Sequence, residues 1–211
     1  MEEIDNGIKC LQRRKSTGTD SMPNEAFIEA DPTTRAIILK TMNQIYVNEN
    51  IPDEWQEGEI IRIYKGKGQK GKCSNERGIT LASNTGKLFE RILDIRIKDN
   101  IDMTEAQAGG QKGKATADHL NIINSIITHN KYKKNKKPLY IAFLDVTKAY
   151  DKAWLNAILY VMHKNGITGK NWRIVKNLNN NLTARIRTNE GLTRKIQIKD
   201  SIRPRGVLSV I

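Results

Sequence analysis

The residues best suited to chemistry lie around position 145, where an acidic side chain follows an apolar run. Residues 139–144 (LYIAFL) precede Asp145 directly, and Tyr150 and Asp151 come a few residues later. A buried strand that ends in a carboxylate holds that group rigidly, and carboxylate oxygens suit Mg²⁺ or Mn²⁺. The alternative is an ordinary strand whose terminal Asp caps the helix that follows it. These residues alone therefore leave both a metal ligand and a helix cap open at Asp145.

Two cations border a glycine-rich loop and are suited to binding phosphates. Lys65 begins the run KGKGQKGK, which covers residues 65–72, and Arg77 follows this run. Arginine offers a planar fork of donors and lysine a point charge, and a triphosphate requires such groups around it. The alternative is an ordinary basic surface, since most of the 36 Lys and Arg residues of this chain must be solvated.

Apolar spacing predicts the elements that position these residues. Helical spacing covers residues 2–14, a helix begins at Asp31-Pro32, and further helices are predicted over residues 86–100, 117–130, 152–165 and 171–181. Strands are predicted over residues 59–64 and 139–144. A hairpin is predicted over residues 183–202, with its turn at residues 189–191. Helices with short strands scattered among them indicate an α+β fold, divided near residue 137.

The composition favours a polyanionic partner. The 211 residues carry a formal net charge of +13, with a pI near 9.7, and Lys and Arg neutralise nucleic-acid phosphates. Cys10 and Cys73 stand far apart without a metal-binding companion, which predicts reduced thiols. No apolar run approaches the roughly 20 residues of a membrane helix, and the N-terminus lacks the apolar segment of a signal peptide. We therefore expect an intracellular protein, nuclear or cytoplasmic, that does not bind a membrane.

Six short motifs follow one another along the chain. The strongest is AFLDVTKAYDKAW, over residues 142–154, in which Asp145 precedes four residues, an aromatic and a second Asp. The others cover residues 15–27, 52–66, 76–97, 106–120 and 200–211. Together, and in this order, they resemble the motifs of reverse transcriptases from non-LTR (LINE-type) retrotransposons.

The resemblance implies the fingers and the first half of the palm of an RNA-directed DNA polymerase. Residues 1–137 would form a fingers-like region and residues 138–211 a partial palm, from motif A to motif B. The implied partners are an RNA template, a DNA primer and dNTPs, and the implied cofactor is Mg²⁺ or Mn²⁺. Asp145 would be the catalytic metal ligand, and Tyr150 would exclude a ribose 2′-hydroxyl. The other residues implied to bind the nucleotide or its base pair are Lys65, Arg77, Arg203 and Ser209.

Two departures from the family pattern bear on activity. Pro204 stands where motif B has glutamine, and it removes a backbone N–H and restricts Arg203; Arg205 stands where the motif has a glycine. The family's second catalytic motif, aromatic-Ala-Asp-Asp, follows motif B, and this sequence contains no Asp-Asp pair. Two-metal transfer requires carboxylates that clamp both ions about 4 Å apart, so we expect the chain to be inactive alone. The alternatives are a non-catalytic nucleic-acid-binding remnant and a pseudogene product.

Overall fold

Helices and one small sheet make up the described part of the chain. The computed structural model describes residues 2–98, 101, 104–111, 113–133, 138–146, 153–198 and 208. Within these ranges the α-helices are α1 (Glu2–Lys9), α2 (Asn24–Ile28), α3 (Pro32–Asn48), α4 (Asn84–Lys98), α5 (Thr116–Tyr132), α6 (Leu155–Lys164) and α7 (Gly169–Asn179). The short 3₁₀ helices are η1 (Asp53–Gln56) and η2 (Cys73–Asn75), and the strands are β1 (Glu57–Tyr64), β2 (Glu76–Ala82), β3 (Thr183–Thr188), β4 (Gly191–Leu192) and β5 (Ile196–Gln197).

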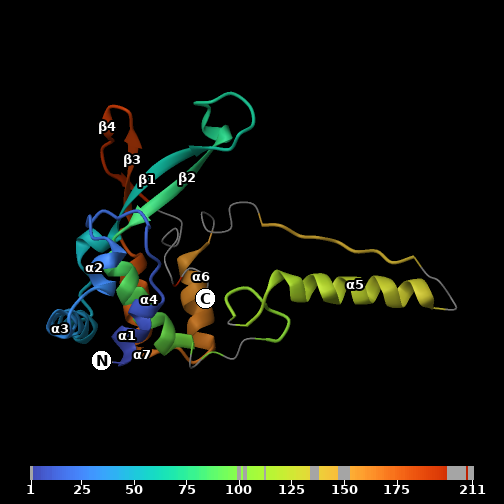
Figure 1. The fold of residues 1–211 in the computed structure, drawn as a ribbon, viewed down its shortest axis with the longest axis horizontal. Helices are drawn as coiled ribbons and strands as arrows, with labels where there is room; N and C mark the ends of the chain where they lie inside the picture. Colours follow the sequence, from blue (N-terminus) through green and yellow to red (C-terminus); the bar gives the residue numbers. More distant parts are fainter. Residues whose placement is uncertain are drawn as a thin grey trace.

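The sheet is organised around β1, which pairs on both of its edges. It runs antiparallel to β2, with Gly58 opposite Ala82 at one end and Tyr64 opposite Glu76 at the other. It runs parallel to β3, with residues 57–60 opposite residues 183–186. The strand order is β2-β1-β3-β4, and β5 pairs with β3. The predicted hairpin is confirmed, because β3 and β4 are antiparallel around the predicted turn (Figure 1).

The core lies in a layer of helices at the base of the sheet. In α4 the apolar residues at i, i+4 and i+5 spacing face inward, so Leu88, Ile92 and Leu93 are each at most 6% exposed. Helix α1 packs on this stripe through Ile4, which is fully buried. Gly7 permits the close approach, because a Cβ at this position would lie 3.2 Å from Leu88 Cδ1. The helix predicted over residues 86–100 is therefore confirmed as α4, except that residues 99 and 100 lie outside the described residues (Figure 1).

Helix α3 begins where the sequence predicted and lies at the edge of the helical layer. The Asp31 carboxylate caps it by accepting hydrogen bonds from the N–H groups of Thr33, at 2.8 Å, and Thr34, at 3.1 Å. Tyr46 attaches its other end to the core, since its hydroxyl donates to Asn171 Oδ1 at 2.8 Å. Of the residues of α3, Met42 alone is fully buried, so one side of this helix remains exposed.

The strand predicted over residues 139–144 is not observed, and this prediction was wrong. Residues 138–146 carry no regular secondary structure, and Leu144 is 96% exposed. A continuous apolar run is stable as a strand when strands flank it and layers cover both faces. The described sheet supplies neither for this segment. Helix α5 likewise buries none of its residues and extends away from the core (Figure 1).

Candidate functional site

The pairing of β1 with β2 places Lys65 and Arg77 on one face of a hairpin. Arg77 lies opposite Ile63, and the Lys65 N–H extends the ladder by donating to the Asn75 carbonyl at 2.9 Å. Side chains alternate along a strand, and opposite residues share a face, so Lys65 and Arg77 are diagonal neighbours. Such pairs lie roughly 7–8 Å apart. Both side chains are exposed, and one phosphate chain can therefore contact both.

The loop between the two strands is held in one shape by its own hydrogen bonds. Gly66 and Gly68 adopt φ values of 76°, which other residues rarely adopt, and these turns fold the loop back on itself. Lys65 Nζ donates to the Ser74 carbonyl at 2.8 Å, and Asn75 Nδ2 donates to the Gln69 carbonyl at 3.0 Å. Lys65 therefore also braces the loop. Sequence reasoning missed Asn75, for which the only signal was a polar residue just before a strand.

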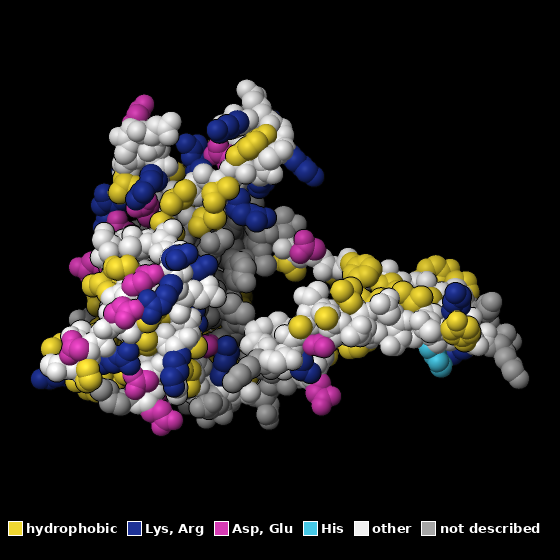
Figure 2. Space-filling view, in the orientation of Figure 1, with side chains coloured by type: hydrophobic (Ala, Val, Ile, Leu, Met, Phe, Trp, Pro, Cys, Tyr) yellow, Lys and Arg dark blue, Asp and Glu magenta, His cyan; other side chains and the backbone are white. Residues whose placement is uncertain are grey.

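The electrostatic environment of the hairpin tip is strongly basic. Residues 65–75 include four lysines and no carboxylate. The nearest acidic residue in sequence, Glu76, alternates to the opposite face and forms an ion pair with Arg62 at 3.2 Å. No ion pair among the described residues involves Arg77. Lys65 and Arg77 thus form no ion pair among the described residues, and both are exposed to an anionic ligand. Figure 2 shows Lys and Arg side chains, in dark blue, around the tip of the β1–β2 hairpin.

Ion pairs further along the same sheet join β1 to β3. Glu57 binds Arg185 and Lys195, each at 2.7 Å, and Glu59 pairs with Arg187. The contact with Lys195 and Arg185 lowers the pKa of Glu57, an effect that burial opposes. Glu57 and Glu59 offset two of the three positive charges of Arg185, Arg187 and Lys195. The uncompensated positive charge is therefore greater at the hairpin tip than along β3.

Asp145, the predicted metal ligand, lies in the exposed segment that carries no secondary structure. No hydrogen bond or ion pair of the described residues joins it to Lys65 or Arg77. Nor does the described part of the chain contain three or more His, Cys, Asp or Glu side chains grouped so that they could hold a metal ion. The other predicted site residues, Tyr150, Arg203 and Ser209, and the neighbouring Asp151, lie outside the described residues.

The motif over residues 15–27 connects a loop to the start of α4. The backbone of Gly18 lies so close to β2 that a Cβ would stand 1.9 Å from the Ala82 carbonyl oxygen. The Asp20 carboxylate accepts hydrogen bonds from the Ser83 hydroxyl at 2.8 Å and from the Thr85 N–H and hydroxyl at 2.9 Å. Burial raises the pKa of Asp20, but the hydrogen bonds lower it by more. The pKa of Asp20 is therefore below its usual value. The motif over residues 15–27 thus attaches the loop before α2 to the end of β2 and the start of α4, and we call it the docking motif.

Comparison with known proteins decides the family. The sequence model described as reverse transcriptase (RNA-dependent DNA polymerase) matches residues 63–198, which is more than half of the chain. The chain belongs to the reverse transcriptase family. This match contains Lys65, Arg77 and Asp145, and the resemblance inferred from the motifs is confirmed at the level of the family.

The similar reverse transcriptases come from non-LTR retrotransposons. The chain is 26% identical over 169 residues to the probable RNA-directed DNA polymerase from transposon BS of Drosophila melanogaster, covering 78% of the chain and 18% of that protein. It is 26% identical over 165 residues to the RNA-directed DNA polymerase from mobile element jockey of the same species, covering 76% and 18%. It is 26% identical over 210 residues to the Pol polyprotein from the type-1 retrotransposable element R2 of Popillia japonica, covering 99% and 28%.

The reverse transcriptase chain therefore spans 18–28% of the length of these curated relatives. The alignment with the R2 polyprotein extends over nearly the whole chain, and so includes the docking motif with Gly18 and Asp20. No helix within the described ranges is long and apolar enough to cross a membrane.

Proposed function

We propose that the β1–β2 hairpin binds the triphosphate of an incoming dNTP in an RNA-directed DNA polymerase. Lys65 supplies a point charge and Arg77 a planar fork of donors, and the two together suit a phosphate chain. The observation that carries the proposal is their placement on one exposed face, without a compensating carboxylate, in a chain of the reverse transcriptase family. Lys65 is already partly immobilised by its bond to Ser74, which reduces the entropy lost on binding.

The remaining roles follow from the family and extend this proposal to the rest of the chain. Residues 1–137 form the fingers and residues 138–211 a partial palm that binds an RNA template and a DNA primer. Tyr150 excludes the ribose 2′-hydroxyl, and Arg203 and Ser209 contact the templating base pair. The net charge of +13 supports the nucleic-acid partners.

The metal site is the weakest fit to the described residues. Asp145 is a suitable oxygen ligand for Mg²⁺ or Mn²⁺, but no group of carboxylates is described around it that would complete a site. Asp145 is therefore the one ligand that the described residues offer, and no catalytic step follows from it. We also propose that the chain alone is catalytically inactive. The second candidate function, a nucleic-acid-binding remnant, is favoured by the same uncompensated basic loop.

Nucleotide binding by single-site variants tests the role of the hairpin. Fluorescence anisotropy with a labelled dNTP in Mg²⁺ buffer would compare the wild type with Lys65→Ala, Arg77→Ala and Arg77→Lys. Loss of one charge-assisted hydrogen bond costs about 1.5–3 kcal/mol, or roughly tenfold or more in affinity. We expect this loss in both alanine variants and a smaller one in Arg77→Lys, which keeps the charge but not the fork. Lys9→Ala, an exposed lysine of α1, is the control.

Two results would reject parts of this proposal separately. If Lys65→Ala and Arg77→Ala bind the dNTP as well as Lys9→Ala does, the hairpin is not the triphosphate site. If Asp145→Ala retains the full dependence of nucleotide binding on Mg²⁺, Asp145 is not the metal ligand. A steep fall of primer-template binding with salt, with no dNTP binding in the wild type, would support the remnant instead.

A further inference from the structure

The loop before α2 presents a serine shortly after two arginines. Arg13 and Arg14 precede Ser16 by three and two residues, in the run RRKS of residues 13–16. All three side chains are exposed, and residues 15–18 carry no regular secondary structure. No hydrogen bond between described residues occupies the Ser16 hydroxyl, so this group is free to react. We call residues 13–17 the arginine loop.

The arginine loop is held at both of its ends. At its start, the Arg13 guanidinium pairs with Glu29 at 2.5 Å, and the Arg14 N–H donates to Glu25 Oε1 at 2.6 Å. Directly after it, the Gly18 backbone lies against the end of β2. Residues 15–17 are exposed between these two attachments. The fold therefore presents Ser16 to solvent at a fixed place on the surface.

The other hydroxyl residues that follow an arginine by three positions are less accessible or lack the second arginine. Thr80 lies within β2 and is paired with β1. Thr188, at the end of β3, donates its hydroxyl to a carbonyl of β4 at 2.9 Å. Thr17 is exposed and follows Arg14 by three residues, but the residue two positions before it is a lysine.

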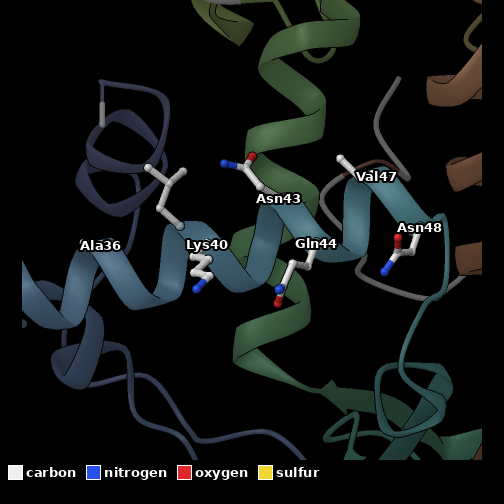
Figure 3. A pocket seen from close by; sticks show the side chains of 7 residues that line it. Ala36, Lys40, Asn43, Gln44, Val47 and Asn48 are labelled. Atoms are coloured by element: carbon white, nitrogen blue, oxygen red, sulfur yellow. The ribbon is translucent and has the colours of Figure 1, made fainter.

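Exposed hydroxyls on regular helices differ from Ser16 in their backbone. Figure 3 shows α3 as a continuous helix from Ala36 to Asn48. Within it the exposed Thr41 donates its hydroxyl to the Ile37 carbonyl at 3.0 Å. Thr41 could enter the cleft of an enzyme in extended form only if this turn unwound, whereas Ser16 requires no such local unfolding.

We propose that Ser16 is the phosphorylation site of an ATP-dependent serine/threonine kinase that recognises arginine. Such kinases select substrates by their charge pattern, and each arginine donates charge-assisted hydrogen bonds to carboxylates beside the kinase cleft. The Ser16 Oγ bonds to the γ-phosphorus of ATP, the bond from this phosphorus to the bridging oxygen breaks, and ADP leaves. The catalytic aspartate of the kinase accepts the hydroxyl proton.

The existing contacts of the two arginines permit this recognition. The side chains of Arg13 and Glu29 are 56% and 64% exposed, and exposed ion pairs of this kind add little stability, so Arg13 can leave Glu29 for the kinase. Arg14 has a φ of 58°, a left-handed conformation that is unfavourable for residues other than glycine. An extended backbone in the kinase cleft relieves this conformation.

Phosphorylation changes the charge of the arginine loop. Arg13, Arg14 and Lys15 carry three positive charges and the loop contains no carboxylate. A phosphoserine adds a charge of about −1.5 to −2 at pH 7. The modified loop is therefore nearly neutral, and its phosphate competes with Glu29 for the Arg13 guanidinium.

Phosphorylation of the full chain in vitro tests the proposal. The chain is incubated with MgATP and the catalytic subunit of cAMP-dependent protein kinase, which recognises arginines two and three residues before its target. Mass spectrometry of the intact chain and of its fragments counts and locates the phosphates. We expect one phosphate, at Ser16, none at Thr80 or Thr188, and no incorporation into Ser16→Ala.

Arginine variants test the recognition itself. Arg13→Ala and Arg14→Ala should each lower the initial rate by about tenfold or more, because each removes charge-assisted hydrogen bonds to the kinase. Arg194→Ala, the same change at an exposed arginine beyond β4, should react as the wild type does. Circular dichroism shows whether each variant is folded.

Three outcomes would overturn the proposal. The first is a wild-type chain that takes up no phosphate while an arginine-containing substrate peptide in the same reaction is modified. The second is a phosphate at Thr17 in place of Ser16. The third is an initial rate at Ser16 that is the same in Arg13→Ala, Arg14→Ala and Arg194→Ala, which would show that the arginines do not direct the enzyme.

Discussion

Replacement of Asp20 by alanine should destabilise the fold, because Asp20 connects the loop before α2 to the start of α4. Its carboxylate accepts three hydrogen bonds from Ser83 and Thr85 at the start of α4, across more than 60 residues of sequence. Loss of a helix cap costs about 1 kcal/mol, and donors left without a charged acceptor cost about 1–3 kcal/mol more. Because such effects are not additive, we expect a loss of roughly 2–3 kcal/mol for Asp20→Ala.

Urea denaturation followed by tryptophan fluorescence measures this loss. Trp55 is a suitable probe, because its ring lies 5.4 Å from that of Phe89 in α4. Asp20→Asn can keep one acceptor oxygen but not the charge, so its loss should be about half as large. Combining Asp20→Ala with Thr85→Val should cost less than the sum of the single changes, since both remove the same bond. A change below about 0.5 kcal/mol in Asp20→Ala would refute the docking role.

The lowered pKa of Asp20 adds a pH test of the same contact. Since the pKa is lower in the folded than in the unfolded state, the stabilising effect is fully present above the unfolded value of about 3.9. It is lost as the pH falls through the folded value. The difference in unfolding free energy between the wild type and Asp20→Ala should therefore stay constant from pH 7 to 5 and narrow below about pH 4. A constant difference down to pH 2.5 would contradict the assignment.

Three further changes probe other contacts by the same denaturation assay. Gly18→Ala places a Cβ 1.9 Å from the Ala82 carbonyl oxygen of β2 and should lower the free energy of unfolding by at least about 2 kcal/mol. Gly109→Ala is the control: it has open space around it and should cost under about 0.5 kcal/mol. Ile4→Ala removes a fully buried side chain and should cost about 2–5 kcal/mol; a loss under 1 would mean that α1 is not docked. Arg187→Met leaves Glu59 without its ion-pair partner and should cost about 1–3 kcal/mol, which adding Glu59→Gln should largely restore.

Sequence patterns predicted most of the helices because their signals are local, although α2 was not predicted and α1 ends earlier than the predicted residue 14. The apolar spacing of Leu88 and Ile92 marked α4, and Asp31 before a proline marked the start of α3. Strand β2 was not predicted, because Arg77 and Gly78 interrupt its apolar pattern and its stability comes from pairing with β1. Over residues 139–144 a strand was predicted but is not observed, because no described strand pairs with this apolar segment.

The candidate site could be predicted as a set of residues but not as an arrangement. Lys65 and Arg77 were chosen from the sequence, but their common face depends on the register of β1 against β2. The bond between Asp20 and Thr85 connects positions 65 residues apart, and no local pattern reveals such a pair. Long-range contacts of this kind depend on tertiary packing, which the sequence pattern alone does not report.

The parallel pairing of β1 with β3 has a consequence for the order of synthesis. The hairpin partner β2 emerges from the ribosome immediately after β1, but β3 follows β1 by more than 120 residues. At about 5–20 residues per second, the second edge of β1 stays unpaired for roughly 6–25 s. An open strand edge is a template for pairing with other chains. The nascent protein is therefore exposed to misassembly during this interval, and slower translation between β2 and β3 should lower its soluble yield.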